Sequence, residues 1–286
     1  MKHVLLLGDE RKGGSKSRVL AFAQWLQGRN CVVDVELDRE TPLVDRRADL
    51  VVVFGGDGSL LGAARRMGRN QLPTLGINVG RLGFLTSYEV DRAQEAVELA
   101  LAGRLREEPR LLLQGSVVDG SGHPLSEPVL CMNDAVVGRA AVGPMITVRA
   151  SRSGEEIATY RGDGLVVATA AGSTAYSMAA GGPVLTPDLQ ALVLTPLASQ
   201  ALSARPLVLP VGDGIDVEVI ETEGKRQAYL QLDGQVRVEV EQGSRAVLRP
   251  APFAFRHLGP GSGHFFKVLR AKFGFTGLPR AMDSRG

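Results

Sequence analysis

The sequence predicts an α/β N-terminal domain with a parallel sheet, followed by an all-β, sandwich-like C-terminal domain. Three observations favour this fold class. The chain has 286 residues, which suits about two domains at roughly 150 residues each. Its first hundred or so residues alternate between strand-like and helical periods of hydrophobicity. Beyond residue 103, short strand-like runs follow one another, separated by glycine, proline and aspartate.

The N-terminal region has the pattern of consecutive βαβ units. Strand patterns occupy residues 3–8, 31–37, 50–54 and 73–78, and helical spacing of apolar residues marks 15–28, 60–67 and 91–101. Strands that alternate with helices in this way indicate a parallel sheet. The run LVVVF at 50–54 is apolar on both faces, as a central strand of such a sheet requires. We expect this domain to span residues 1–103.

Residues 104–260 predict the β-rich domain. Strand-like runs lie at 111–119, 128–137, 145–151, 163–169, 205–210, 215–221, 227–233, 236–241 and 244–250. Only 173–180 and 190–199 have a helical pattern. Short strands with turn signals between them are typical of a sandwich. From residue 263 the spacing of Phe265, Phe266, Leu269 and Phe273 is helical again, and we expect the C-terminal segment 261–286 to pack back on the first domain.

Composition excludes several classes of protein. The 33 basic and 31 acidic residues give a net charge of +2, so there is no basic field for wrapping nucleic acid. No segment approaches the ~20 apolar residues of a membrane span, and the apolar run at the N-terminus is too short for a signal peptide. Cys31 and Cys131 lie in apolar runs and are expected to be buried thiols in a reducing compartment. We therefore expect a cytoplasmic protein.

The strongest local signal for chemistry is GGDGS at residues 55–59, between the strand 50–54 and the following helix. Open α/β sheets bind ligands at the carboxyl ends of their strands. Gly55, Gly56, Gly58 and Ser59 suit a phosphate-binding loop, because glycine lets the backbone approach phosphate and the helix presents its first amides. Asp57 would repel phosphate, so it must cap the helix, hold a metal or accept a proton.

Two further segments are rich in polar groups. The first, residues 163–184, places Gly172, Ser173, Thr174, Tyr176 and Ser177 between strands, and its hydroxyls suit a polyhydroxylated ligand. The second is the pair at 133–134, within the apolar run 128–137. An Asn-Asp pair inside a strand is costly unless a partner satisfies it, and the flanking apolar runs disfavour a turn there.

These segments together resemble the NAD kinase family. GGDGS, GINVGRLGFLT at 76–86, the pair at 133–134, DGLVVATAAGSTAY and SARPLVLP at 203–210 match that family's motifs in order and spacing, over residues 4 to about 275. The resemblance implies an active site in the cleft between the two domains. It also implies transfer of the ATP γ-phosphate, with a divalent cation, to the 2′-hydroxyl of the adenosine ribose of NAD, which gives NADP.

The resemblance also assigns residues by motif position. Asp57 matches the proton acceptor. The residues that match contacts to NAD are Asp57, Gly58, Asn133, Asp134, Arg161, Asp163, Thr174, Ala175, Tyr176, Ser177, Met178, Ala179, Ala198 and Gln235. We expect Mg²⁺ to arrive on the ATP phosphates with few protein ligands, because that ion keeps most of its waters. The sequence does not identify those ligands.

Two other functions share some of these features. A diacylglycerol-type lipid kinase also carries GGDG, although the chain has no amphipathic basic helix for a membrane surface. A non-catalytic NAD-binding regulator would keep the dinucleotide contacts without Asp57. The alternating run VRVEVE at 236–241 predicts an exposed strand edge. Together with the family resemblance it predicts a homo-oligomer, a dimer or tetramer, with NAD and ATP as its ligands.

Overall fold

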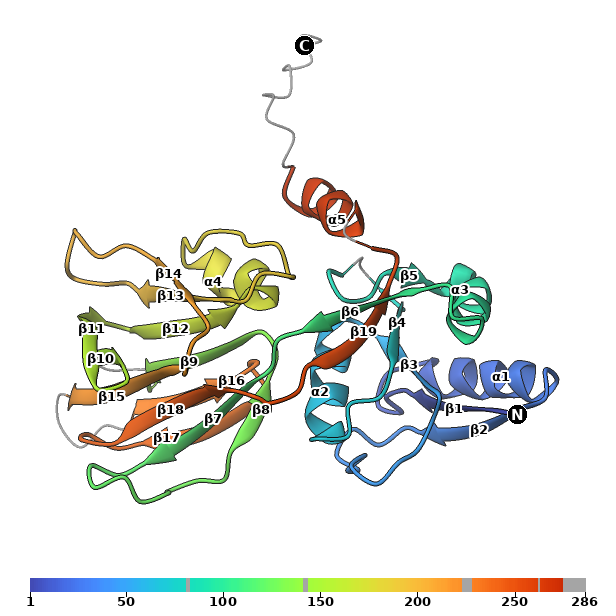
Figure 1. The fold of residues 1–286 in the computed structure, drawn as a ribbon, viewed down its shortest axis with the longest axis horizontal. Coiled ribbons are helices and arrows are strands. Elements are labelled where there is room, and N and C mark those ends of the chain that lie inside the picture. The colour runs from blue at the N-terminus through green and yellow to red at the C-terminus, as the bar shows by residue number, and fades with distance from the viewer. Residues whose placement is uncertain (81–82, 141–143, 223–227, 262, 275–286) are drawn as a thin grey trace, which may run out of the picture.

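A computed structural model describes residues 1–80, 83–140, 144–222, 228–261 and 263–274. It contains an N-terminal α/β domain and a C-terminal β-sandwich, with two strands running between them (Figure 1). The predicted fold class, an α/β domain with a parallel sheet followed by a sandwich-like all-β domain, is confirmed.

The first sheet has the strand order β2-β1-β3-β4-β19-β6, and β5 pairs with β4. All its pairs are parallel except β19 with β6. Its strands are β1 (Lys2–Leu7), β2 (Cys31–Glu36), β3 (Leu50–Gly55), β4 (Thr74–Asn78), β5 (Tyr88–Glu89), β6 (Arg106–Arg110) and β19 (Phe255–Gly259). As the sequence predicts, β3 is central and buried along its whole length.

Helices cover both faces of this sheet. One face packs against α1 (Ser15–Gln27) and α3 (Ala93–Leu101), which follows the 3-10 turn η1 (Val90–Arg92). The other face packs against α2 (Asp57–Met67) and against β8 (Val129–Cys131) of the second domain. Leu130 and Met132 share that core with Leu60 and Met67 of α2. The two domains are therefore joined by a common hydrophobic cluster.

The sandwich consists of two antiparallel sheets around one apolar core. The first has the order β11-β10-β15-β18-β7-β8, with β7 (Leu113–Val118), β10 (Ile146–Arg152), β11 (Glu155–Gly162), β15 (Ile215–Thr222) and β18 (Arg245–Pro250). The second has the order β14-β13-β12-β9-β16-β17, with β9 (Asp134–Arg139), β12 (Gly164–Thr169), β13 (Ala191–Leu197), β14 (Leu207–Pro210), β16 (Ala228–Leu232) and β17 (Val236–Val240). Buried residues alternate with less buried ones along β7 and β10, as a half-covered sheet requires.

Two local predictions are wrong and a third is confirmed only in part. Residues 190–199 are not helical, because β13 pairs with β12 and β14 on its two sides and buries Val193 and Leu194. The helix expected at 173–180 is shorter and divided, into η2 (Ala171–Thr174) and α4 (Tyr176–Ala179). The run 128–137 is not one strand: a bend at residues 132–133 divides it into β8 and β9, which belong to different sheets.

The connection between the domains consists of β6 and β19, which pair antiparallel (Figure 1). Both fall within the range 104–260 that the sequence assigns to the β-rich domain, yet both belong to the first sheet. After β19 the chain forms α5 (Gly263–Phe273). Phe265 and Phe273 of α5 lie 5.6 and 6.0 Å, ring centre to ring centre, from Phe84 in the first domain. The described part of the C-terminal segment thus contacts that domain.

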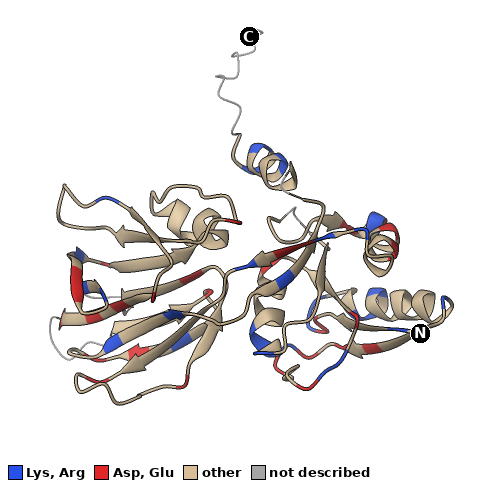
Figure 2. Cartoon of the chain, in the orientation of Figure 1, with Lys and Arg blue, Asp and Glu red and all other residues tan. Residues whose placement is uncertain are grey.

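Acidic and basic residues are interspersed in both domains (Figure 2), in keeping with the net charge of +2. None of the helices in the described part of the chain is long and apolar enough to span a membrane. Cys31 and Cys131 are both free; Cys131 is buried as expected, whereas Cys31 is only partly buried, so that expectation is wrong for it.

Candidate active site

The GGDGS segment connects β3 to α2 at the carboxyl end of the parallel sheet. A side chain at Gly55 would overlap Ser59, so the turn requires glycine there. Gly56 is the N-cap of α2 and provides no side-chain cap. The first amides of α2 therefore face the space in front of the loop, where a helix N-terminus favours an anion.

The carboxylate of Asp57 does not cap the helix that it begins. Its Oδ1 accepts hydrogen bonds from the amides of Leu85 and Thr86, at 3.1 and 3.0 Å, and from the Thr86 hydroxyl at 3.1 Å. Its Oδ2 accepts one from the Phe84 amide at 2.8 Å. Of the three roles that the sequence left open, helix capping is thus wrong. The 84–86 loop donates three consecutive amides to this carboxylate, whereas no side chain caps the helix.

These contacts leave one atom of Asp57 able to accept a further hydrogen bond. A carboxylate oxygen accepts about two, and Oδ1 already has three donors whereas Oδ2 has one. The neighbouring Gly83 has to be glycine, because a side chain there would overlap the Asp57 carboxylate. The loop therefore holds the half-buried carboxylate in a fixed orientation, with Oδ2 as the acceptor that remains.

The pair at 133–134 lies at the bend between β8 and β9, and Asp233 holds that bend. The Asp233 carboxylate accepts hydrogen bonds from the amides of Met132, Asn133 and Asp134, the shortest from Asn133 at 2.7 Å. Its own amide donates to the Asp134 carbonyl at 2.9 Å. The bend forms because the Asp233 carboxylate accepts hydrogen bonds from these three amides. In a continuous strand, such amides would donate to a neighbouring strand instead.

Asp134 and Asp233 form a buried pair of carboxyl groups. Burial and the nearby Asp233 raise the pKa of Asp134 to about 7, although the Tyr176 amide donates to it. Burial also raises the pKa of Asp233, but its amide donors and the charge of Arg65 act in the opposite direction. Asp134 therefore keeps its proton up to about pH 7, far above the pH at which an ordinary carboxyl group loses it. A neutral carboxyl group, able to donate a hydrogen bond, lies beside Asn133.

The segment that carries the hydroxyls packs directly on this bend. Gly172 approaches so closely that a side chain would overlap the Asn133 carbonyl. Ser173 is buried and its Oγ accepts a hydrogen bond from the backbone of the same loop at 2.9 Å. Ser177 is also buried, and its hydroxyl lies 2.8 Å from that of Thr195. These two hydroxyls hold the loop in place.

Tyr176 is 48% exposed and lies near two other predicted residues, Asp163 and Asp134. Burial, followed by the neighbouring Tyr229, Asp163 and Asp134, raises the pKa of its phenol. Asp163 pairs with Arg139 at 2.6 Å, and Arg161 pairs with Glu221 at 2.9 Å. The other predicted contacts are partly or fully exposed and comprise Thr174, Ala175, Met178, Ala179 and Ala198. The structure therefore brings Tyr176, Asp163 and Asp134 together, with the exposed side of the loop beside them.

Gln235 connects the two halves of the site. It lies in the turn between β16 and β17, and its Nε2 donates to the Gly58 carbonyl of α2 at 2.9 Å. Its Oε1 accepts a hydrogen bond from Arg65 Nη2, also in α2, at 2.6 Å. The residue thus links the sandwich to the glycine loop of the first domain.

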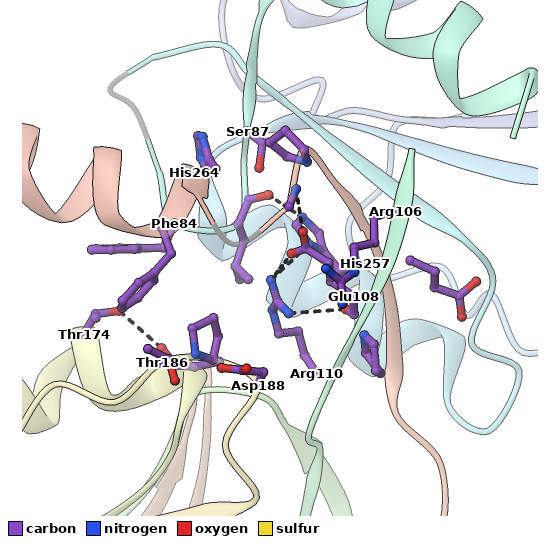
Figure 3. Close-up of a pocket in the computed structure, with 18 of the residues that line it drawn as sticks. Phe84, Ser87, Arg106, Glu108, Arg110, Thr174, Thr186, Asp188, His257 and His264 are labelled. Atoms are coloured by element: carbon purple, nitrogen blue, oxygen red, sulfur yellow. Dashed lines mark hydrogen bonds and ion pairs between the residues drawn. The ribbon is translucent and has the colours of Figure 1, made fainter. Parts of the chain in front are cut away.

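A cavity of about 430 Å³ opens where the two domains, the connecting strands and α5 meet (Figure 3). Phe84 and Thr174 lie on one side of it, and Glu108, Arg110 and His257 gather on the other. A second, much smaller cavity of about 30 Å³ lies beside Ser59 and Gly62 and is bordered by Arg39, Arg65 and Arg66. The larger cavity thus has room for a ligand, and the smaller one places three arginines beside the glycine loop.

Comparison with known proteins agrees with this arrangement. Residues 12–105 match the ATP-NAD kinase N-terminal domain, and residues 132–258 match the ATP-NAD kinase C-terminal domain. The chain belongs to the NAD kinase family. An NAD kinase of Bordetella parapertussis is 38% identical over 98% of each chain. An NAD kinase of Heliobacterium modesticaldum is 39% identical over 88% of this chain and 91% of its own.

Solved structures of NAD kinases have the same fold. An NAD kinase from Archaeoglobus fulgidus in complex with ATP has a TM-score of 0.76 and 25% identity, and the match covers 95% of this chain and 98% of that one. A yeast NADH kinase complexed with NADH has a TM-score of 0.86 and covers 98% of this chain and 89% of its own. At 22% identity, the yeast protein shows the fold alone.

Sequence reasoning missed some residues of this NAD kinase site. Asp233 precedes a glycine, which by itself indicates only a hairpin turn. The amides of residues 84–86 belong to a motif that the family resemblance includes. Every residue except proline has a backbone N–H, so the residue types do not reveal which amides act as donors. His257 lies in a short run, 255–259, that the sequence analysis did not assign to any strand.

Proposed function

We propose that the protein is an ATP-dependent NAD kinase, which transfers the ATP γ-phosphate to the 2′-hydroxyl of the adenosine ribose of NAD and so forms NADP. Membership of the family supports this activity, and both matched domain families are those of ATP-NAD kinases. The observation that carries the mechanism is the Asp57 carboxylate, held by three amides and a hydroxyl with Oδ2 still able to accept. Nothing in the comparisons supports the lipid kinase or the non-catalytic regulator.

In this mechanism Asp57 Oδ2 accepts a hydrogen bond from the 2′-hydroxyl of the ribose and so orients its oxygen toward the γ-phosphorus. A carboxylate is a weak base for a hydroxyl, so the proton moves late, as the new oxygen–phosphorus bond forms and the bond to ADP breaks. Because four donors already fix the carboxylate, alignment costs little at the moment of reaction.

The sandwich supplies the proposed dinucleotide site. Asn133 and the neutral carboxyl of Asp134 offer donors and acceptors for ribose or base, and Tyr176 offers a half-exposed ring for stacking. The remaining contacts are proposed from their motif positions in the resemblance: Gly58, Arg161, Asp163, Thr174, Ala175, Ser177, Met178, Ala179, Ala198 and Gln235.

The proposed ATP side is the glycine loop and the small arginine-lined cavity next to it. Gly55, Gly56, Gly58 and Ser59 precede or begin α2, whose first amides favour phosphate oxygens. Arg65 Nη1 and Arg66 Nη2 are buried nitrogens without a hydrogen-bond partner, and both residues border the cavity. Guanidinium groups are strong donors to phosphate, which supports phosphate binding on this side.

A divalent cation, Mg²⁺, is also proposed. In the parts of the chain that the structure describes, no three His, Cys, Asp or Glu side chains are placed to hold a metal ion. The residues present do not form a dedicated metal site, so the cation would be held chiefly by the ATP phosphates, whose charge it neutralises. The steps assigned to Asp57 above use no protein-bound metal.

We also propose a homo-oligomer in the cytoplasm. The strand β14 is an edge of its sheet, and Leu207 and Val208 on it are exposed, which favours association with a second copy. Free cysteines are consistent with a reducing compartment. Light scattering at micromolar concentration should give a multiple of 30.4 kDa, and a mass of one chain would overturn the proposed assembly.

The experiment that tests the function measures NADP⁺ formation from NAD, ATP and Mg²⁺, coupled to an NADP-specific dehydrogenase. Asp57→Asn keeps an oxygen for the donors on Oδ1 but replaces Oδ2 by an NH₂ group, which accepts neither the ribose hydroxyl nor the Phe84 amide. We expect kcat to fall about 10²–10⁴-fold, the usual effect of losing a positioned acid–base group. Thr86→Val is the matched control, because it removes one donor to Oδ1 and leaves Oδ2 intact, so kcat should fall less than about tenfold. Absence of NADP⁺ with the wild-type protein would refute the proposed function.

A further inference from the structure

A buried histidine contacts the loop that holds Asp57. His257 lies on β19 with only 1% of its surface exposed. Its Nε2 is 2.8 Å from the carbonyl oxygen of Leu85. A carbonyl oxygen can only accept, so Nε2 carries a proton and donates it in this hydrogen bond.

The Leu85 carbonyl and the Thr86 amide belong to the same peptide group. That group is planar and trans, so its oxygen and its N–H point in opposite directions. The oxygen accepts from His257 at 2.8 Å, and the N–H donates to Asp57 Oδ1 at 3.0 Å. The histidine therefore fixes the rotation of the peptide whose amide holds the carboxylate. Hydrogen bonds in such a chain also polarise and strengthen one another.

The other nitrogen of the histidine ring is held by a buried ion pair on β6. Arg110 Nη2 lies 3.4 Å from His257 Nδ1, and Glu108 Oε2 lies 3.5 Å from it. Glu108 also pairs with Arg110 and accepts a hydrogen bond from the Gly261 amide at 2.8 Å. Burial acts to raise the pKa of Glu108, but His257 and Arg110 outweigh it and hold that pKa at about 2. The ion pair is therefore intact at neutral pH.

We infer that His257 is a positioning residue for Asp57, acting through the peptide group between Leu85 and Thr86, and that Glu108 and Arg110 hold its ring in the required orientation. This inference rests on the proposed function, in which Asp57 Oδ2 receives the ribose proton. Without the histidine the buried carbonyl of Leu85 loses its donor, and the peptide turns to find another. The Thr86 amide then leaves Asp57, and the carboxylate no longer directs Oδ2 at the substrate.

The test compares two substitutions of the histidine with a control on the same strand. His257→Gln keeps an N–H donor near the position of Nε2, whereas His257→Leu fills the space without a donor. Leu258→Ala is the control, because Leu258 faces the opposite core, packed with α1 and α3, and touches neither Leu85 nor Asp57. Urea unfolding of all three shows whether each is folded before its kinetics are read.

We expect His257→Leu to lower kcat about 10- to 100-fold while the KM for ATP changes less than about threefold, since misplacing a catalytic group by about 1 Å has an effect of this size. His257→Gln should recover kcat to within about fivefold of the wild type. The control, Leu258→Ala, should be less stable than the wild type, but its folded molecules should have the wild-type kcat. A folded His257→Leu with wild-type kcat, or a folded His257→Gln as slow as His257→Leu, would overturn the inference.

A second measurement does not depend on activity. Amide hydrogen exchange of the 84–86 loop reports whether its N–H groups remain bound to Asp57. Exchange should be at least about tenfold faster in His257→Leu than in the wild type, with little change in His257→Gln. If the wild type forms no NADP⁺, the proposed function fails, whereas exchange still decides the positioning: unchanged exchange in His257→Leu would overturn it.

Discussion

Replacing Asp134 by Asn removes a buried ionisable group while keeping its size and its acceptor for the Tyr176 amide. In the wild type, burial and Asp233 raise the pKa of Asp134 from 3.8 to about 7. Below about pH 3 the group is protonated in both the folded and the unfolded chain and affects stability little. Between about pH 4 and 7 the unfolded chain releases a proton that the folded chain keeps, so the free energy of unfolding falls as the pH rises.

The size of this effect follows from the shift. Each pKa unit corresponds to about 1.4 kcal/mol, so the group lowers stability by about 2 kcal/mol at pH 5 and by about 4 kcal/mol at pH 8. Asn carries no such charge. The stability of Asp134→Asn relative to the wild type should therefore increase by about 2–3 kcal/mol between pH 5 and pH 8.

Urea unfolding at several pH values from 5 to 8 measures this difference directly. Asn133→Ala is the matched control, because it alters the neighbouring side chain at the same bend and introduces no titration. Its effect on the free energy of unfolding should be the same at both ends of the range. A constant difference between Asp134→Asn and the wild type would mean that the two carboxyl groups do not share a buried site as described.

Two other predictions concern contacts between distant parts of the chain. Gly172→Ala should lower the free energy of unfolding by more than about 2 kcal/mol, because the new methyl group overlaps the Asn133 carbonyl; a urea unfolding midpoint like that of the wild type would contradict this close packing. Gln235→Ala removes the bonds to Gly58 and Arg65 and should cost about 0.5–1.5 kcal/mol in the same assay, with a severalfold rise in the KM for NAD; unchanged values for both would show that the link between the domains has no energetic role.

Local patterns were sufficient for the alternating strands and helices of the first hundred or so residues, although not for β5, β6 and β19. The apolar run at 50–54 is buried along its whole length in β3, and the helical spacing that follows gives α2 three residues earlier than predicted, at Asp57. The difference arises because Asp57, Gly58 and Ser59 have no apolar period, although they form the first turn of the helix. The predicted loop position at the carboxyl end of the sheet follows from the same pattern.

Tertiary contacts decided the places where local patterns failed. The spacing of apolar residues in 190–199 fits a helix or a strand. Pairing with β12 on one side and β14 on the other makes this segment the strand β13. Asp57 begins a helix, where a carboxylate usually caps, yet its donors come from residues 84–86, about thirty positions away in the chain. The bend at 132–133 depends on Asp233, a hundred residues further on. No short sequence window contains either pair of partners.

The strands that connect the domains also build the back of the active site. Glu108 and Arg110 lie on β6, on the way out of the first domain, and His257 lies on β19, on the way back. Their antiparallel pairing places His257 opposite Glu108, and this pair stands behind the peptide that holds Asp57. Gln235 and the glycine loop join the domains on the other side of α2. The hydrogen bonds that hold Asp57 therefore end on the two strands that carry the chain between the domains.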